Sequence, residues 1–222
     1  MSTRIAVVGI TGDPPTLGHV WLAQTADRTG RFDQVWLMPC GRHRYGKQTA
    51  PAKHRLAMTR LAADYAGGRV IASAYEMEHQ DGTSLDGSCF VTTSMLREDY
   101  PGCQFTWVIG LDNAITFRHW HMAELLMEGS LTNFLVCARP GVLLPKGPQW
   151  FETPPHSFVT GEGGVESSSS DFRKWYAAGD PRFASLVPPS VLQYIDTHSV
   201  YGSHANASQD EEGRQSRHTE LR

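Results

Sequence analysis

Short apolar runs alternate along the chain with longer amphipathic stretches. The apolar runs are rich in β-branched and aromatic residues and end at glycine, proline or polar residues, which is typical of buried strands. We predict strands over residues 5–10, 35–38, 70–72, 105–109 and 134–138, and one more near 157–159. The stretches between and after them predict helices over residues 16–28, 51–66, 90–100, 123–127, 170–178 and 189–198.

This alternation of strands and helices predicts the fold class. Strand–helix–strand units build parallel sheets that helices cover on both faces. We therefore expect an α/β fold, a doubly wound parallel sheet of five to six strands with a C-terminal helical segment. Residues 1–202 would form this domain, and residues 203–222, which have almost no apolar side chains, would form a disordered polar tail. Ligands of such sheets bind at the carboxyl ends of strands, which singles out the loops after Ile10 and Ile109.

The strongest chemical motif is G-I-T-G-D-P-P-T-L-G-H at residues 9–19, which joins the first strand to a helix. It is neither a dinucleotide-binding G-x-G-x-x-G nor a P-loop, because its second glycine comes one position late and no Gly-Lys-Ser/Thr follows. Its glycines let a ligand approach the backbone, and free N–H groups at a helix start favour phosphate. Thr16 would cap the helix and donate to a phosphate, and His19 would add a donor or a positive charge. The alternative is a packed corner with His19 beneath it.

Residues 168–173 predict a second anion site. Ser168 and Asp171 have the spacing of a capping box, and serine hydroxyls with Arg173 at a helix start suit an anion. The alternative is a serine-rich linker that follows the glycines at 161–164.

Several further side chains each have two interpretations. Asp112 follows a buried strand and a glycine, so it would accept from ribose hydroxyls or cap a helix. Trp120 would stack on a pyridine ring or pack as an ordinary tryptophan. Lys47 would reach a phosphate or remain a solvated loop residue. We interpret His54 and Arg55 as the polar face of a helix and leave them outside the site.

Composition narrows the class of protein. The chain has 222 residues, of which 40% are hydrophobic and 19% charged, and its formal net charge is −3. These figures exclude a disordered protein and argue against a nucleic-acid-binding one, and no apolar run approaches the roughly 18 residues that span a bilayer. The 4 cysteines form no C-x-x-C pair, which favours reduced thiols and a cytoplasmic protein. Residues 34–63 contain basic residues but no Asp or Glu, and this local positive charge suits a mononucleotide and a triphosphate.

The T-L-G-H string at residues 16–19 resembles the T/H-x-G-H signature of the α/β nucleotidyltransferase superfamily. Further segments, in the family's order, resemble the nicotinamide/nicotinate mononucleotide adenylyltransferases. These segments are Y-G-K at 45–47, K-H-R-L-A-M at 53–58, I-G-L-D-N at 109–113, F-R-H-W at 117–120, R-P-G at 139–141, S-S-S-D-F-R at 168–173 and L-V-P-P-S-V-L-Q-Y-I at 186–195. The resemblance covers the chain from residue 5 to about residue 201.

The resemblance implies a Rossmann-like nucleotidyltransferase that joins ATP to nicotinamide or nicotinate mononucleotide, giving NAD or its deamido form and pyrophosphate. It implies His19, Thr16 and Arg173 as catalytic residues, and Mg²⁺ held mainly by substrate phosphates, with no metal ligands from the protein. The implied ATP-binding residues are Gly9, Ile10, Thr11, Gly18, His19, Gly110, Asp112, Ser168, Ser169 and Arg173. The implied mononucleotide-binding residues are Lys47, Phe90 and Trp120.

The sequence also departs from the family pattern. Gly12 stands where an aromatic residue is usual, Phe90 replaces a threonine that helps to hold the pyridine ring, and Ser167 replaces an apolar residue. Thr16 stands where this branch more often has histidine. These departures leave open a different nucleotidyltransferase, using CTP or ATP with a phosphopantetheine-like or phosphonate acceptor, and also a non-catalytic nucleotide sensor. The amide or acid form of the mononucleotide and a homo-oligomeric state stay open as well.

Overall fold

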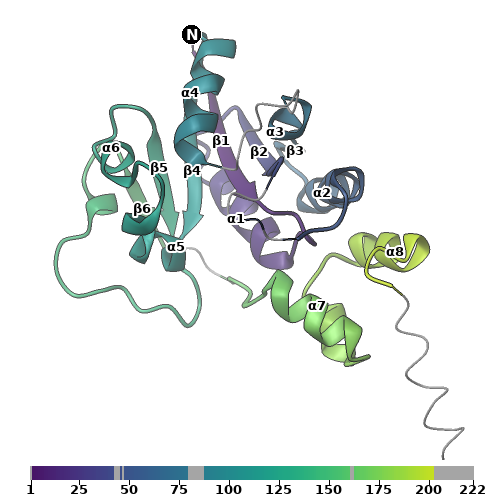
Figure 1. Cartoon of the computed structure of the whole chain (residues 1–222). Coiled ribbons are helices and arrows are strands. Elements are labelled where there is room, and N and C mark those ends of the chain that lie inside the picture. The colour runs from purple at the N-terminus through teal and green to yellow at the C-terminus, as the bar shows by residue number, and fades with distance from the viewer. Residues whose placement is uncertain (1, 43–45, 47, 80–87, 161–162, 203–222) are drawn as a thin grey trace, which may run out of the picture.

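Parallel strands form one sheet through the centre of the molecule (Figure 1). The computed structural model describes residues 2–42, 46, 48–79, 88–160 and 163–202. The strands are β1 (Thr3–Ile10), β2 (Gln34–Pro39), β3 (Val70–Ala72), β4 (Cys103–Gly110), β5 (Asn133–Cys137) and β6 (Ser157–Val159). Their order in the sheet is β3-β2-β1-β4-β5-β6, and every pair is parallel. The predicted doubly wound sheet is confirmed, and its switch point lies between β1 and β4, where the direction of winding reverses.

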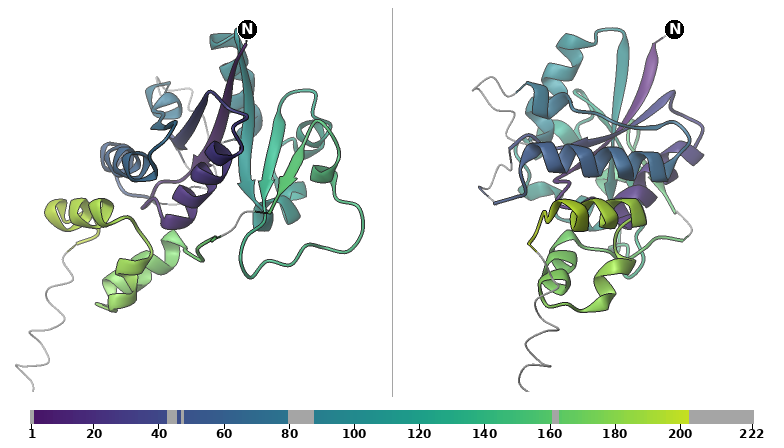
Figure 2. Two further views of the ribbon diagram at one scale, coloured as in Figure 1. Left: turned by 180° about the vertical axis from the view of Figure 1, so that it is seen from behind. Right: turned by 90° about the vertical axis from the view of Figure 1, so that its right-hand side faces the viewer.

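Helices pack against both sides of the sheet (Figure 2). One side carries α1 (Leu17–Arg28), α2 (Ala52–Ala66), α7 (Ser169–Ala177) and α8 (Pro189–His198). The other side carries α3 (Tyr75–Glu78), α4 (Cys89–Asp99), α5 (Leu111–Ile115) and α6 (Ala123–Met127). Short 3-10 turns span Phe117–His119, Trp150–Glu152 and Pro181–Ser185. Helices α7 and α8 are the predicted C-terminal helical segment, and α8 lies beside α2.

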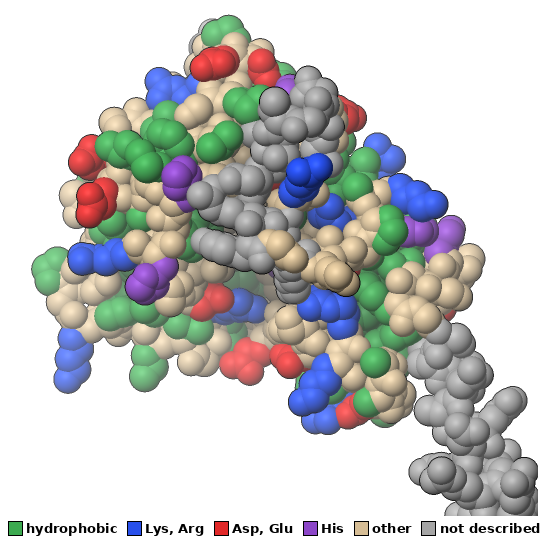
Figure 3. All heavy atoms as spheres, in the orientation of Figure 1, with side chains coloured by type: hydrophobic (Ala, Val, Ile, Leu, Met, Phe, Trp, Pro, Cys, Tyr) green, Lys and Arg blue, Asp and Glu red, His purple; other side chains and the backbone are tan. Residues whose placement is uncertain are grey.

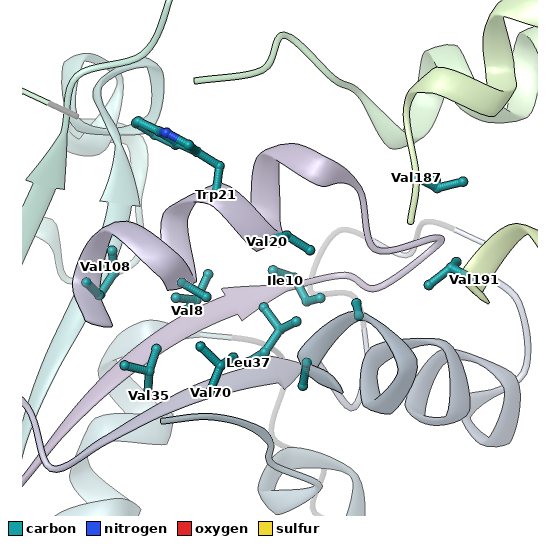
Figure 4. Close-up of a cluster of buried hydrophobic side chains, with 14 of the residues drawn as sticks. Val8, Ile10, Val20, Trp21, Val35, Leu37, Val70, Val108, Val187 and Val191 are labelled. Carbon is teal, nitrogen blue, oxygen red and sulfur yellow. The ribbon is translucent and has the colours of Figure 1, made fainter. Parts of the chain in front are cut away.

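The hydrophobic core has two clusters, one on each face of the sheet. In β1, Val8 and Ile10 belong to the cluster under α1 and α2, whereas Val7 belongs to the opposite one, as the alternation of side chains along a strand requires. Figure 4 shows Val8 and Ile10 packed with Val20 of α1 and Leu37 of β2. Because the central strands are covered on both faces, their sequences are nearly continuous apolar runs.

Two short helices, α3 with 4 residues and α5 with 5 residues, were not predicted from the sequence. The equally short α6 and the 3-residue strands β3 and β6 were predicted. Helix α1 begins at Leu17, with Thr16 as its N-cap. The predicted tail at 203–222 lies outside the described residues. None of the helices in the described ranges is long and apolar enough to cross a membrane.

The guanidinium of Arg55, in α2, holds together the loops that follow β1 and β2. The Arg55 residue is only 3% exposed. Its Nη1 donates to the carbonyl oxygens of Thr11 (2.9 Å) and Cys40 (2.6 Å). Its Nη2 donates to the carbonyl oxygen of Gly41 (2.8 Å), and its Nε to that of Ala50 (3.0 Å). The expectation that Arg55 lies on a polar helix face is wrong, because the loop carbonyls draw its side chain inward.

Asp13 fixes the same loop to the C-terminal part of the chain. Its residue is 1% exposed, and its Oδ1 accepts from the N–H of Ala50 (3.1 Å) and from the hydroxyl of Tyr201 (2.8 Å). Its Oδ2 lies 3.3 Å from Nη1 of Arg173, in α7. Segments far apart in the sequence thereby set the position of the loop that leads into α1.

Replacing Arg55 by methionine should lower the free energy of unfolding by about 3 kcal/mol, because buried carbonyl oxygens lose their donor while the side chain keeps its length. Urea unfolding followed by circular dichroism measures this change. The matched control is Arg60→Met, at an exposed position of the same helix, which should cost less than about 0.5 kcal/mol. Equal losses of unfolding free energy in the two variants would contradict the conclusion that Arg55 holds these loops together.

Candidate active site

A cavity of about 400 Å³ opens at the carboxyl ends of β1 and β4, where the loops after Ile10 and Ile109 meet. Figure 3 shows this face hollowed near its centre, with acidic and basic side chains together along the lower edge of the hollow. The cavity brings together many of the residues named from the sequence. They are Gly9, Ile10, Thr11, Gly18, His19, Gly110, Asp112 and Trp120.

The first turn of α1 forms one wall of the cavity, and its first amides already have acceptors. The N–H of Leu17 donates to the carbonyl oxygen of Leu186 (2.9 Å), and the N–H of Gly18 donates to Oγ of Ser167 (2.7 Å). The sequence predicted free N–H groups here for a phosphate, and for these two amides that expectation is wrong. The positive end of the helix dipole still faces the cavity, so the helix favours an anion without needing these two amides as donors.

His19 faces the cavity as a defined tautomer. Its Nδ1 accepts a hydrogen bond from the backbone N–H of Thr16 (2.9 Å), so that nitrogen carries no proton. The neutral ring must then carry its proton on Nε2, which makes His19 a hydrogen-bond donor to a ligand in the cavity. The hydroxyl oxygen of Thr16 lies 3.0 Å from the same Nδ1. Thr16 itself is 1% exposed and does not line the cavity, so its link to the cavity is through His19.

The ionisation of His19 fits this tautomer. Burial lowers the pKa of His19 to about 4, the positive charge of Arg139 acts in the same direction, and the carboxylate of Asp112 opposes them. His19 is therefore neutral at pH 7. Of the two functions predicted for this side chain, a donor or a positive charge, the ligand-free geometry supports the neutral donor.

An ion pair lies in the cavity between the loops that follow β4 and β5. Nη1 of Arg139 donates to Oδ2 of Asp112 (3.0 Å), and its Nη2 donates to the carbonyl oxygen of Ser167 (2.9 Å). The other carboxylate oxygen of Asp112, Oδ1, is buried and has no hydrogen-bond partner among the described residues. A Cβ at Gly110 would lie 2.4 Å from this oxygen, so the close approach of Asp112 requires glycine there.

A smaller cavity of about 330 Å³ meets the first at Arg139, which lines both. Ser168 lines this smaller cavity and caps α7, since its Oγ accepts from the N–H groups of Ser170 (3.2 Å) and Asp171 (3.3 Å). The carboxylate-bearing residues Glu166 and Asp171 also line it. The predicted helix start at Ser168 is therefore present, but it faces the smaller cavity and its side chain is occupied as a cap.

Ser169 and Arg173 line neither of the two cavities. Ser169 donates from Oγ to the carbonyl oxygen of Pro14 (2.9 Å). Arg173 bonds to the backbone oxygen and carboxylate of Asp13, and its Nη2 donates to Oγ of Ser170 (3.3 Å). Both side chains hold the loop before α1.

The mononucleotide residues named from the sequence are placed unevenly. Trp120 lines the cavity and packs its ring 4.7 Å from that of Phe117. Phe90 does not line it, and its ring meets that of His121 edge-on at 6.1 Å. Lys47 lies outside the described residues. Ser88 and Cys89, at the start of α4, do line the cavity, so this helix directs its positive end toward it.

Several cavity residues were not identified from the sequence as part of the site. Arg139 was noted only within the R-P-G string. Its position at the end of a predicted strand was a usable signal, because the strand that precedes Asp112 ends at the same edge of the sheet. Glu76, in the unpredicted helix α3, accepts from the hydroxyl of Thr92 (2.6 Å) and from the N–H of Gly41 (3.2 Å). Arg42 also lines the cavity and belongs to the basic segment at 34–63.

Comparison with known proteins connects this geometry to one class of enzyme. Residues 9–174 match the model of the cytidylyltransferase-like family. A probable nicotinate-nucleotide adenylyltransferase of Anaeromyxobacter dehalogenans is 31% identical, over 89% of this chain and 96% of that protein. One of Myxococcus xanthus is 28% identical, over 90% and 96%.

Solved structures agree with the fold. The nicotinic acid mononucleotide adenylyltransferase of Plasmodium falciparum, complexed with APC, superposes with a TM-score of 0.73 at 17% identity, over 90% of this chain and 97% of that one. At this identity the likeness bears on the fold alone. Together, the family model and the sequence relatives agree with the resemblance that the motifs indicated.

Replacing Gly110 by alanine should weaken the binding of ATP about tenfold or more, because the new methyl group pushes Asp112 away from its place beside Arg139. Isothermal titration calorimetry measures the dissociation constant. The matched control is Gly102→Ala, where an added Cβ meets nothing within 4 Å, and it should leave ATP binding unchanged. Unaltered ATP binding in the Gly110 variant would contradict the conclusion that ATP binding depends on the position of Asp112 beside Gly110.

The lowered pKa of His19 predicts how stability depends on pH. Its folded-state value of about 4 lies below the usual 6.5, so the unfolded chain binds more protons between these values and stability falls as the pH drops through that window. Urea unfolding at pH 7 and pH 5 should show the wild type losing about 1–2 kcal/mol more than His19→Asn, whose amide oxygen still accepts from Thr16. Identical losses would show that His19 titrates normally.

Proposed function

The chain belongs to the cytidylyltransferase-like family, and we propose that it joins ATP to nicotinate mononucleotide, releasing pyrophosphate and forming the deamido dinucleotide. The chain is a nucleotidyltransferase with nucleotide substrates. The finer proposal rests on one observation: a single cavity combines a neutral imidazole N–H, a guanidinium and a carboxylate with an aromatic wall.

The polar side of the cavity suits ATP. The Nε2–H of His19 would donate to an oxygen of the α-phosphate, and the positive charge of Arg139 would offset the charge that builds up there. The carboxylate of Asp112, which lines the cavity, would accept from a ribose hydroxyl. Gly9 also lines the cavity, and a Cβ there would lie 2.6 Å from the ring of Trp107, so the packing of Trp107 favours glycine at this position.

The function of the second anion site, predicted at residues 168–173, stays a proposal. Ser168, Ser169 and Arg173 would hold the β- and γ-phosphates or the departing pyrophosphate. Arg173 is 25% exposed at its side chain and already bonded to Asp13, so it would have to turn or share its N–H groups to reach a phosphate. Thr16 would act through the orientation that it gives to His19.

The reaction needs no strong base from the protein. A 5′-phosphate oxygen of the mononucleotide, already anionic at pH 7, forms a bond to the α-phosphorus of ATP. The bond from that phosphorus to the bridging oxygen breaks, and pyrophosphate leaves with the electron pair. The protein's contribution is to align the two phosphates and to stabilise the charge on the α-phosphate. A neutral donor at His19 suits this task, because it carries a proton throughout and transfers none.

Magnesium, the usual companion of a triphosphate, would neutralise its charge when bound. Among the described residues, no group of at least three His, Cys, Asp or Glu side chains is placed to hold a metal ion. The donor set thus fits an ion held by phosphate oxygens and water, with carboxylates such as those of Glu166 and Asp171 nearby in the smaller cavity.

The acid form of the mononucleotide is favoured by the start of α4. Ser88 and Cys89 place the positive end of an 11-residue helix at the cavity, which suits a carboxylate better than a neutral amide. Trp120 would face the pyridine ring. The relatives from Anaeromyxobacter and Myxococcus are named for the nicotinate substrate, which supports the same choice.

A pyrophosphate-release assay with the full chain and Mg²⁺ tests this proposal. ATP with nicotinate mononucleotide should react at least about tenfold faster than ATP with nicotinamide mononucleotide, and CTP should not replace ATP. A faster reaction with the amide form would refute the nicotinate proposal, and a faster reaction with CTP would refute the adenylyl proposal. ATP binding without any pyrophosphate release would favour a nucleotide sensor.

His19→Ala should lower kcat about a hundredfold or more while leaving the fold intact, because the α-phosphate loses its positioned donor. Circular dichroism checks the fold. His198→Ala, at an exposed position of α8, is the control and should keep wild-type kcat. Near-normal turnover in the His19 variant would remove this residue from the mechanism.

A further inference from the structure

Ser167 stands apart from its neighbours in the serine run at 167–170. It is 8% exposed, and its Oγ accepts the N–H of Gly18 (2.7 Å) while donating to Oγ1 of Thr16 (3.1 Å). A Cβ at Gly18 would lie 2.7 Å from this oxygen, so Ser167 is packed tightly over the first turn of α1. In the sequence, Ser167 was notable only as a departure from the family pattern.

The direction of each hydrogen bond in this cluster can be assigned. Nδ1 of His19 accepts from the backbone of Thr16 and therefore has no proton to give. The Thr16 hydroxyl, 3.0 Å from the same nitrogen, can only donate to it, sharing the single lone pair with the backbone N–H, and this hydroxyl accepts in turn from Ser167. The result is an ordered chain from Ser167 through Thr16 to His19.

The backbone of Ser167 is held as firmly as its side chain. Its carbonyl oxygen accepts from Nη2 of Arg139 (2.9 Å), whose Nη1 is bonded to Asp112 (3.0 Å). Ser167 thus connects the first turn of α1, which carries His19, with the guanidinium of Arg139. A shift of this one residue would move both groups that face the α-phosphate.

We propose that Ser167 is a positioning residue for nucleotidyl transfer, whose hydroxyl orders the Thr16 hydroxyl so that Thr16 holds the His19 ring with its Nε2–H aimed into the cavity. It touches no substrate in this scheme and acts only through Thr16, Gly18 and His19. Its hydroxyl also accepts from the Gly18 amide, where an anion would otherwise bind. The donors to the α-phosphate would then be His19 and Arg139.

Steady-state kinetics of Ser167→Ala provide the first test, and this part rests on the proposed substrates. We expect kcat to fall about fivefold to tenfold, while the KM for ATP changes by less than about twofold, because one hydrogen bond that orients a donor is lost. Ser167→Thr keeps the hydroxyl and should restore most of the activity. Ser167→Cys fills nearly the same volume as serine but has only a weak donor, so it should lower kcat as Ser167→Ala does. This variant tests the same hydrogen bond in case Ser167→Ala folds poorly.

A double-mutant cycle separates a relay from two independent structural effects. Thr16→Val removes the middle hydroxyl, and adding Ser167→Ala to it should lower kcat by less than about twofold further. Thr132→Val is the control, since it removes a buried hydroxyl bonded to the carbonyl oxygen of Phe105 (3.1 Å) at the amino end of β5. It should leave kcat unchanged.

Nitrogen-15 NMR of the histidine rings tests the same proposal without any substrate. At pH 7 the wild type should show His19, assigned by its loss in His19→Asn, with an unprotonated Nδ1 and a protonated Nε2. In Ser167→Ala, the pKa of His19 should rise, since the Thr16 hydroxyl is no longer held in the orientation that donates to the unprotonated Nδ1, while the facing charges of Arg139 and Asp112 are unchanged.

Additive effects in the cycle, or an unchanged kcat in both Ser167→Ala and Ser167→Cys, would overturn the relay. An unchanged titration of His19 would overturn it as well. If no variant or wild-type protein uses nicotinate mononucleotide, the proposed substrate fails, and the NMR result alone decides on the relay.

Discussion

The hydrogen bond from the backbone N–H of Thr16 to Nδ1 of His19 determines what this cavity can do. It sets the tautomer, and together with burial and Arg139 it keeps the ring neutral at pH 7. A neutral imidazole with its proton on Nε2 can donate to a phosphate throughout a reaction without titrating. That property matches phosphoryl chemistry in which the nucleophile is already ionised and the enzyme needs to orient charge more than to move protons.

The bond in turn depends on long-range contacts around the loop before α1. Arg55 gathers the carbonyl oxygens of the loops after β1 and β2, and Asp13 binds the same loop to Tyr201 and Arg173. Arg55 and Asp13 are buried, so each would be costly to leave unpaired. The C-terminal part of the chain therefore helps to position the loop before α1, although it lies outside the sheet that carries most of the cavity.

The sheet was predictable because its central strands are buried on both faces and so are unbroken apolar runs, as in β1 and β4. The T-x-G-H string, Asp112 and Trp120 could be named as candidates for the cavity from the sequence alone. The local signals for them are the end of a strand, a glycine and an aromatic side chain, which can be recognised without knowing the tertiary contacts. Arg55 was misjudged, since only the folded loops supply the carbonyl oxygens that bury it. The amides of α1 were expected to be free, since no local pattern shows that Leu186 and Ser167 reach back to them.

The most direct test of this account is a crystal structure with an unreactive ATP analogue and nicotinate mononucleotide bound together. The account predicts Nε2 of His19 within hydrogen-bond distance of an α-phosphate oxygen, Arg139 beside the same phosphate, and the 5′-phosphate of the mononucleotide aligned for attack. A complex in which the α-phosphate lies beyond the reach of His19, or in which His19 is turned with Nδ1 toward the ligand, would contradict it.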